Sequence, residues 1–323
     1  MLMSTLYLDR KNLAVKLDGH AMALYENDVK RGTVPFKLLD KIVVKGNIQI
    51  ESRLLCALSE NRVDVLFLSA RNNARQAMAF SHSHNDVKRR LAQLSVYFKA
   101  DVRFDLSRQL VDAKIAKQLQ FLNNALDARP DLRKYLFSAI QTIFSIEKNV
   151  SVLEQGSGST AKLRGYEGSA AAAYFSAYTK LFAESLAFKQ RKKRPPTDPV
   201  NACLSLAYTL LHFEAVGVCY RVGLEPLLGF YHEPAVGRES LACDLIEPLR
   251  PRVDAFVWFL FRERMLREEY FSQDQGRCVL NKAGRKCFYA QYENFVHPVR
   301  RLLRLHGYRL ARFYLECEWD SIL

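Results

Sequence analysis

The sequence predicts an α+β fold in which a small β-rich N-terminal domain precedes a larger, mostly α-helical domain. Two patterns support this. In the first 80 residues, apolar and polar side chains largely alternate, which is the two-residue period of a half-buried strand. From residue 81 to 323, apolar residues recur at steps of three and four, the period of an amphipathic helix. The boundary is therefore expected near residue 80, and 323 residues suffice for two packed domains.

The N-terminal domain should contain strands, one helix and a tight hairpin. Asp18-Gly19 interrupts the second apolar run where a two-residue turn needs positive φ. Residues 51–62 have helical spacing instead. Strands are predicted at residues 4–9, 13–27, 40–51, 62–69 and 75–81.

The second domain is expected to be helical throughout. The prolines and basic residues between 189 and 199 should interrupt it, because proline cannot continue a helix. Helices are predicted at residues 86–126, 131–150, 163–188, 198–223, 251–271 and 297–313.

The charge balance indicates a polyanionic partner. The chain has 48 Lys and Arg residues against 34 Asp and Glu residues, a formal net charge of +14. Such an excess suits nucleic acid or an acidic membrane surface, although a generally basic protein would share it. The dispersed basic segments and the lack of a lipid-anchor motif disfavour the membrane.

The other totals predict a soluble, cytoplasmic protein. The seven cysteines form no C-x-x-C pair, so reduced thiols are expected rather than disulfides or a zinc site. The N-terminal residues are charged too early for a signal peptide. The longest apolar run, residues 200–220, is interrupted by His212 and Glu214 and is expected to contain too few apolar residues to span a membrane.

Two basic segments are candidates for contacting phosphates. Five of the six residues from 189 to 194 are basic, and residues 297–313 place arginines against leucines in an amphipathic pattern. A solvated loop and a core-packed helix with outward arginines are the simpler alternatives. The predicted DNA-binding residues are Arg164, Lys189, Arg191, Lys192, Lys193, Arg194, Arg238, Arg300, Arg301 and Arg304.

The stretch GFYHEPAVGRESLACDLIEPLRP, residues 229–251, has the composition of a metal site. His232 lies in a turn rich in proline and glycine, and Ser240 is a plausible N-cap for the helix that follows. Asp244 and Glu247 are three residues apart and share a face of that helix. A structural histidine and an acid that complements the helix dipole are the alternatives. Together, the imidazole and two carboxylates favour a hard divalent cation.

Glu167 is the best candidate for a further ligand. It lies at the start of an alanine-rich helix, where a carboxylate is costly to bury unless it is paired or bound to metal. A simple first-turn acid is the alternative. Oxygen ligands with one imidazole suit Mg²⁺ or Mn²⁺ better than structural zinc, and in a basic protein such an ion indicates phosphodiester chemistry. No nucleotide-binding P-loop matches.

Three blocks of the sequence resemble the CRISPR-associated spacer-acquisition integrase, the larger of the two core adaptation proteins. The blocks are LRGYEGSAAAAYF, RPPTDPVNACLSLAYTLL and GLEPLLGFYHEPAVGRESLACDLIEPLRPRVD, within residues 163–254. The resemblance implies that Glu167, His232 and Glu247 hold the metal and carry catalysis, with Asp244 as an alternative or supporting ligand.

The resemblance also implies partners and a reaction. Two homodimers, formed through the N-terminal domain, would be bridged by a small ferredoxin-like adaptation protein into a heterohexamer. The implied reaction joins the 3′-OH ends of a short DNA duplex to phosphodiesters of a CRISPR repeat by transesterification. A metal-dependent nuclease that cuts branched or single-stranded nucleic acid without joining, and a non-catalytic nucleic-acid scaffold, are the competing functions.

The chain departs from the family pattern at one position. Pro248 follows Glu247 directly, where a residue compatible with helix is common in the family. Because proline cannot donate to the carbonyl of Asp244, the helix should kink or end there. Which of the two acids is the direct ligand is therefore left open.

Overall fold

The structure is a computed structural model that describes residues 4–10, 12–69, 75–81, 84–156, 159–192 and 195–319. The chain divides into two compact units, residues 1–85 and residues 86–323, where the sequence places the boundary near residue 80. The first unit contains most of the strands and the second most of the helices, so the predicted α+β class is confirmed.

The first unit consists of two four-stranded sheets and one helix, α1. One sheet has the order β1-β5-β7-β8, in which β1, β5 and β7 are parallel, and the other has the order β4-β3-β2-β6. Apolar side chains from both sheets and from α1 form one core. The elements are β1 (Ser4–Leu8), β2 (Leu13–Asp18), β3 (Ala21–Glu26), β4 (Val29–Pro35), β5 (Leu39–Lys45), β6 (Gln49–Ile50), α1 (Ser52–Glu60), β7 (Asp64–Leu68) and β8 (Arg75–Ala79).

The predicted hairpin is present, one residue later than expected. Asp18 pairs with Ala21, so the turn is Gly19-His20, and Gly19 has φ +57°. The next turn and strand β4 were not predicted. Asn27 and Asp28 both have positive φ, as a type I′ turn requires, but Gly32 and the charged residues of β4 obscure its strand pattern.

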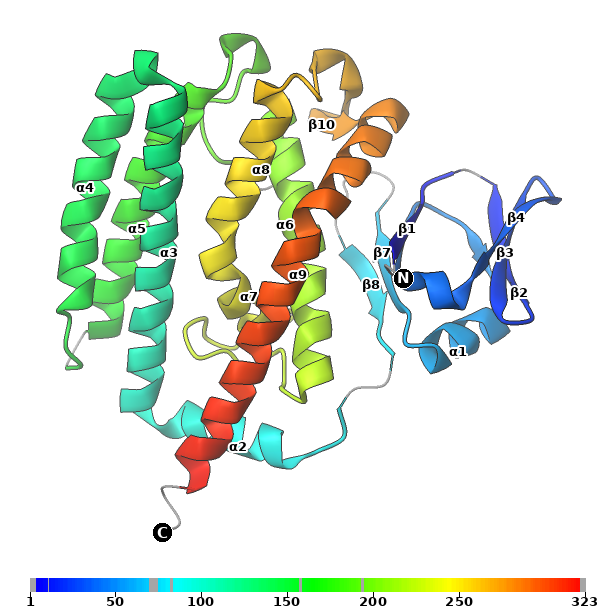
Figure 1. Ribbon diagram of the computed structural model, residues 1–323, viewed down its shortest axis with the longest axis horizontal. Coiled ribbons are helices and arrows are strands. Elements are labelled where there is room, and N and C mark those ends of the chain that lie inside the picture. The colour runs from blue at the N-terminus through cyan, green and yellow to red at the C-terminus, as the bar shows by residue number, and fades with distance from the viewer. Residues whose placement is uncertain are drawn as a thin grey trace. The chain divides into compact units, whose positions relative to one another are not determined.

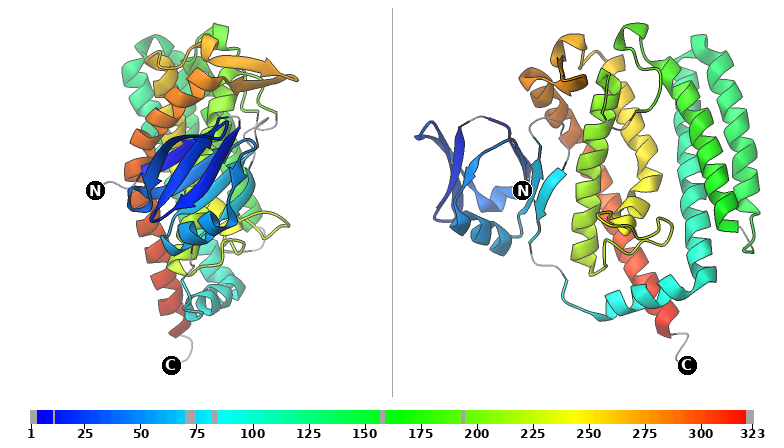
Figure 2. Two further views of the ribbon diagram at one scale, coloured as in Figure 1. Left: turned by 90° about the vertical axis from the view of Figure 1, so that its right-hand side faces the viewer. Right: turned by 180° about the vertical axis from the view of Figure 1, so that it is seen from behind.

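The second unit is a helical bundle with one small hairpin. In Figures 1 and 2, α3, α4 and α5 lie side by side, and α6, α8 and α9 form the rest of the bundle. The region predicted as one helix over 86–126 is two helices, because Lys99 is extended with ψ 95°. The elements are α2 (Lys88–Phe98), α3 (Ala100–Ala128), α4 (Arg133–Ser151), α5 (Ser159–Tyr178), α6 (Pro199–Val222), α7 (Ser240–Ile246), α8 (Arg250–Arg262), β9 (Phe271–Asp274), β10 (Arg277–Leu280) and α9 (Lys282–Trp319).

Helix α6 forms the centre of this unit. Asp198 caps its N-terminus by accepting a hydrogen bond from the backbone N–H of Asn201 at 2.8 Å, and Pro199 occupies its first position. Contrary to the expectation for residues 200–220, this helix is long and apolar enough to cross a membrane, but 78% of its most apolar window is buried inside the structure. Its apolar surface is therefore used in the protein core.

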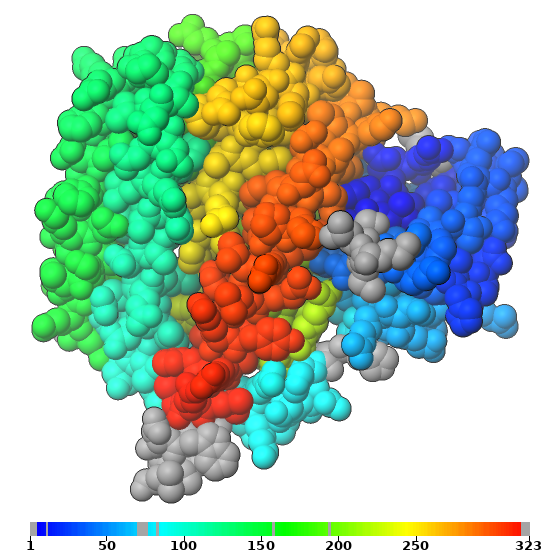
Figure 3. All heavy atoms as spheres, viewed as in Figure 1, coloured from blue at the N-terminus to red at the C-terminus, as the bar shows by residue number. Residues whose placement is uncertain are grey.

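Helix α9 runs along the surface of the unit, with α2 beside its C-terminal part (Figure 3). The hairpin β9–β10 precedes it and was missed, because apart from Phe271 its four-residue strands follow the helix predicted over 251–271, in a stretch for which no element was predicted. That helix, α8, ends at Arg262 instead.

Candidate metal and phosphate site

Four predicted residues meet in the helical unit. Glu167 lies on α5, His232 lies in the loop between α6 and α7, Asp244 lies on α7, and Glu247 opens the 3₁₀ turn Glu247–Leu249 that follows. Asp244 is completely buried and the Glu247 side chain is 5% exposed, whereas Glu167 and His232 are partly accessible. The site therefore has a buried acidic floor and an open side.

Pro248 shapes this floor. Helix α7 ends at Ile246 and the chain continues as a 3₁₀ turn before α8 begins, so the expected interruption at Pro248 is confirmed. The carbonyl of Asp244 is not freed, because it accepts the N–H of Glu247. The N-cap expected at Ser240 is wrong: Ser240 is already helical, and its hydroxyl donates to the carbonyl of Glu233 at 3.1 Å.

Both oxygens of Asp244 are occupied by the loop that carries His232. Oδ2 accepts the backbone N–H groups of Phe230 and Tyr231 at 2.8 and 3.0 Å. Oδ1 accepts the N–H of His232 at 3.0 Å and lies 2.6 Å from its Nδ1. With Nδ1 donating to Asp244, the Nε2 atom is left as an acceptor, 3.9 Å from Glu247 Oε1. Both oxygens of Asp244 therefore face the loop and hold the backbone and the imidazole of His232 in place.

Glu247 is an ionised carboxylate between two cations. Arg250 Nε lies 2.7 Å from its Oε1, and Lys114 Nζ lies 2.7 Å from its Oε2. Burial alone would raise the pKa of Glu247, but the charges of Arg250 and Lys114 outweigh burial and hold that pKa at about 2. Although Oε2 is in ion-pair contact with Lys114, it receives no well-aligned hydrogen bond within the described part of the chain.

Lys114, on α3, is the site residue that the sequence reasoning missed. Its ammonium contacts Glu167 Oε1 as well as Glu247 Oε2, so one cation bridges carboxylates from two segments. Burial would lower the pKa of Lys114, but both acids raise it, so the side chain is charged. The available signal was its position: Val111 and Gln118, one turn to either side on α3, are buried, and a lysine on that face needs a partner.

Tyr231 completes the support of Glu167. Its hydroxyl donates to Glu167 Oε2. Burial, as the larger effect, and this hydrogen bond together raise the pKa of Tyr231 well above its ordinary value. The phenol therefore stays protonated. Both oxygens of Glu167 are in contact with donors, one neutral and one charged.

Glu233 anchors the far end of the loop. Arg103 on α3 lies 2.7 Å from Glu233 Oε1, and Arg164 on α5 lies 3.5 Å from the same atom. Arg238 donates to the Glu233 carbonyl. The guanidinium of Arg164 is half exposed at the opening of the site, where it could contact a phosphate.

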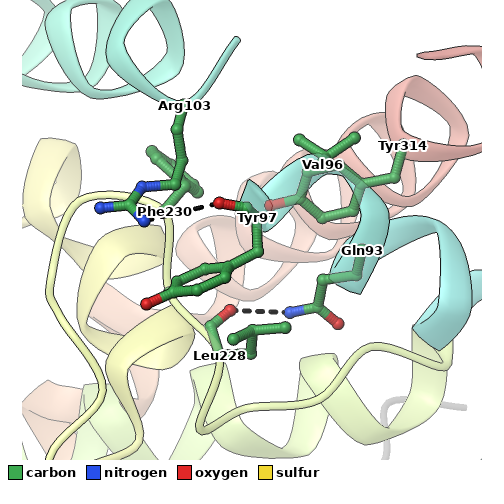
Figure 4. A pocket seen from close by; sticks show the side chains of 8 residues that line it. Gln93, Val96, Tyr97, Arg103, Leu228, Phe230 and Tyr314 are labelled. Carbon is green, nitrogen blue, oxygen red and sulfur yellow. Dashed lines mark hydrogen bonds between the residues drawn. The ribbon is translucent and has the colours of Figure 1, made fainter. Parts of the chain in front are cut away.

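A close-packed crevice lies behind the loop (Figure 4). Gln93 on α2 donates to the carbonyls of Leu228 and Glu225 at 2.7 and 3.0 Å and accepts the N–H of Glu225, and Tyr97 and Arg103 lie at the other side. Val96, Phe230 and Tyr314 also line this crevice. The hydrogen bonds of Gln93 thus hold the start of the loop against α2.

Gly229 allows the loop to pass close to α7. A Cβ at this position would lie 2.7 Å from Asp244 Oδ2 and 2.8 Å from both the His232 carbonyl oxygen and the backbone carbon of Ser240. No side chain fits there without displacing the carboxylate that orients His232. The glycine is therefore required by close approach, not by its φ.

The predicted DNA-binding residues fall into four groups. Lys189, Lys192, Arg301 and Arg304 are exposed, and Arg164 and Arg238 line the loop described above. Lys193 and Arg194 lie outside the described residues. Arg191 donates to Asn201 Oδ1 at 2.8 Å and Arg300 pairs with Glu214 and Glu293, so the placement of these two argues against the phosphate contacts expected of them.

The donor set fits a hard divalent cation, but not without rearrangement. Glu167, Glu247 and His232 Nε2 supply two carboxylates and one imidazole, and Glu247 Oε2 is buried in ion-pair contact with Lys114. In the described part of the chain, no three His, Cys, Asp or Glu side chains are close enough to hold an ion as they stand. The ammonium of Lys114 lies between the two carboxylates instead.

These features define a class of protein: an α+β chain whose basic helical unit buries an acidic, histidine-containing site. A profile of the family described as CRISPR-associated protein Cas1 matches residues 6–294. A CRISPR-associated endonuclease Cas1 of Thermodesulfovibrio yellowstonii is 39% identical over 324 aligned residues, covering 99% of each chain. The chain therefore belongs to the Cas1 family, as the sequence blocks indicated.

Solved structures share the fold. A Cas1 protein from Thermotoga maritima superposes with a TM-score of 0.82 at 22% identity, covering 97% of each chain. A casposase bound to its integration product superposes with a TM-score of 0.81 at 19% identity, covering 97% of this chain and 91% of the casposase. At these identities the similarity establishes the architecture.

Proposed function

We propose that this protein is a divalent-metal-dependent DNA endonuclease and integrase of CRISPR adaptation. The observation that carries the proposal is the meeting of Glu167, His232 and Glu247, from three separate segments, at one partly open position in a basic helical unit. Membership of a family that includes a 39% identical endonuclease supports the reaction class.

Glu167, Glu247 and the Nε2 atom of His232 are the proposed ligands for Mg²⁺ or Mn²⁺. Asp244 is assigned to positioning, because all of its acceptor capacity faces the loop 230–232. Arg250 holds Glu247 from the side opposite Lys114 and is itself kept charged, because the nearby Glu247 outweighs the effect of burial on its pKa.

When bound, the metal would polarise a phosphate and stabilise the charge that develops on it. The proposed reaction is a transesterification: the 3′-oxygen of the incoming strand bonds to phosphorus, and the P–O3′ bond of the repeat strand breaks. The attacking hydroxyl loses a proton and the leaving 3′-oxygen gains one, so the number of phosphodiesters is conserved. Arg164, half exposed beside the site, is placed to neutralise a neighbouring phosphate.

The DNA contacts, the cellular location and the protein partners are also proposed. DNA would be held by exposed Lys189, Lys192, Arg301 and Arg304, and the net charge of +14 favours its approach. The protein would be a cytoplasmic homodimer that assembles with the small ferredoxin-like partner. Both points rest on the family.

The test is a joining assay. The protein, with and without the small partner, is mixed with a fluorescent 3′-OH duplex and a supercoiled plasmid that carries the repeat, in Mg²⁺ or Mn²⁺. We expect label joined covalently to plasmid, and no joining by His232→Ala. Joining that survives in His232→Ala would refute the site. Nicking without joining would favour the simple nuclease, and neither activity would favour the scaffold.

A further inference from the structure

The ammonium of Lys114 lies at the point where the two proposed carboxylate ligands come together. It contacts Glu167 Oε1 and lies 2.7 Å from Glu247 Oε2, and only 12% of the side chain is exposed. Gln118, on the same side of α3, is buried, and the helix directs Lys114 into the site rather than to solvent. Its positive charge therefore neutralises these two carboxylates.

Two carboxylates that share one position repel each other, and a cation between them offsets this repulsion. Arg250 contacts Oε1 of Glu247 and Tyr231 donates to Oε2 of Glu167, while Oε1 of Glu167 and Oε2 of Glu247 both contact Lys114. A metal ion bound by these same oxygens needs them at about 2.0–2.2 Å, which leaves no room for an ammonium between them. Lys114 and the ion thus require the same oxygens.

We propose that Lys114 is a built-in counter-ion that occupies the cation position of the metal-free protein and is displaced when the metal binds. This inference rests on the proposed metal site. In the metal-free state Lys114 keeps the carboxylates together and stabilises the fold. The presence of Lys114 lowers the affinity for the metal, because the metal ion must displace a favourable ion pair and then bind beside a positive charge. Lys114 is a positioning residue with respect to the reaction.

The sign of the effect on metal binding separates this role from ordinary structural support. Mn²⁺ affinity is measured by calorimetry, or by the loss of the free Mn²⁺ electron paramagnetic resonance signal. We expect Lys114→Met to bind Mn²⁺ at least fivefold more tightly than wild type, and Lys114→Arg no more tightly than wild type. Lys117→Met, which removes the same charge one turn away beside Gln120, should leave the affinity within twofold.

Thermal unfolding gives a second readout that needs no activity. In EDTA, Lys114→Met should melt below wild type, and saturating Mn²⁺ should raise its melting temperature by more than it raises that of wild type. If Lys114→Met does not fold without metal, the wild-type protein alone still tests the inference. Labelling of Lys114 by an amine-reactive reagent, followed by mass spectrometry, should increase on adding Mg²⁺.

The outcomes distinguish the counter-ion role of Lys114 from the existence of the metal site. Mn²⁺ binding by wild type with equal or weaker binding by Lys114→Met, or Lys114 labelling that does not rise with Mg²⁺, would overturn the counter-ion role and leave the metal site standing. Failure of both wild type and Lys114→Met to bind Mn²⁺ would overturn the metal site itself, and this inference with it.

Discussion

His232 Nδ1 lies 2.6 Å from Asp244 Oδ1, and the same oxygen accepts the backbone N–H of His232 at 3.0 Å. One carboxylate thus fixes both the ring and the backbone of the proposed metal ligand. When Nδ1–H donates to Asp244, the other ring nitrogen, Nε2, is the atom that faces Glu247. The chemistry of His232 depends on a residue that is completely buried.

Asp244→Asn should separate orientation from ligation. The amide keeps the shape of Asp244 but replaces one acceptor oxygen with a donor. Depending on which oxygen is replaced, Asp244→Asn loses either the hydrogen bond to His232 Nδ1 or those to the N–H groups of Phe230 and Tyr231. We expect Mn²⁺ affinity to fall about 10- to 100-fold with a folded protein. Asp244→Ala should also lower the free energy of unfolding by about 3 kcal/mol, because buried N–H groups lose their acceptor. Unchanged affinity in Asp244→Asn would refute the positioning role.

Gly229→Ala should damage the site through packing. The added Cβ would come within 2.8 Å of the His232 carbonyl oxygen and closer still to Asp244 Oδ2. We expect the free energy of unfolding to fall by about 1–3 kcal/mol, measured by urea denaturation, together with a loss of Mn²⁺ binding. Gly165→Ala, a helical position with open space, is the control and should be neutral or slightly stabilising. Equal effects of the two substitutions would contradict this account.

The sequence could predict most of the elements and the residues proposed as ligands, but not Lys114 between the two glutamates. Period-2 and period-3.6 patterns predicted most strands and helices, and Pro248 marked the end of α7. Strand β4 was missed because polar and glycine residues obscure its alternation. Lys114 was missed because it lies 53 positions before Glu167, and only the packing of α3 against α5 brings the two together. Arg300 was placed with the exposed arginines because periodicity does not identify its buried partners.

Asp254 should make the stability of the helical unit depend on pH. Burial raises its pKa from 3.8 to about 6, against the hydrogen bonds that it accepts from Tyr208 and Tyr174. A carboxyl whose pKa is higher in the folded state stabilises fully below its unfolded pKa, and this contribution is lost as pH rises through 6. Relative to Asp254→Asn, wild type should therefore gain about 1–1.5 kcal/mol of unfolding free energy between pH 8 and pH 5. Denaturant titrations of both proteins at the two pH values measure it, and a constant difference would refute the raised pKa.

The loop after α5 should contain phosphate-binding and structural cations side by side. Lys189 and Lys192 are exposed, whereas Arg191 donates to Asn201 and lies over the ring of Tyr208 at 5.5 Å. Replacing both lysines with glutamate should weaken DNA binding and reduce the slope of log affinity against log salt by about 0.9 per lost contact. Arg191→Gln should leave the slope unchanged and lower thermal stability. The reverse pattern would restore Arg191 as a phosphate ligand.

The arginines of α9 should divide in the same way, with the larger stability effect at Arg300. Its Nε lies 2.8 Å from Glu214 and its Nη1 lies 2.8 Å from Glu293, and its side chain is 12% exposed. Removing the guanidinium takes away the cation that lies 2.8 Å from buried Glu214, so Arg300→Gln should cost about 3 kcal/mol of unfolding free energy. Arg301→Gln and Arg304→Gln, on exposed positions of the same helix, should each cost less than about 0.5 kcal/mol and instead flatten the salt dependence of DNA binding. Fluorescence anisotropy across a salt series and urea denaturation of the three variants measure both effects. A stable Arg300→Gln with a flattened salt dependence would show that Arg300 leaves its carboxylates to bind DNA.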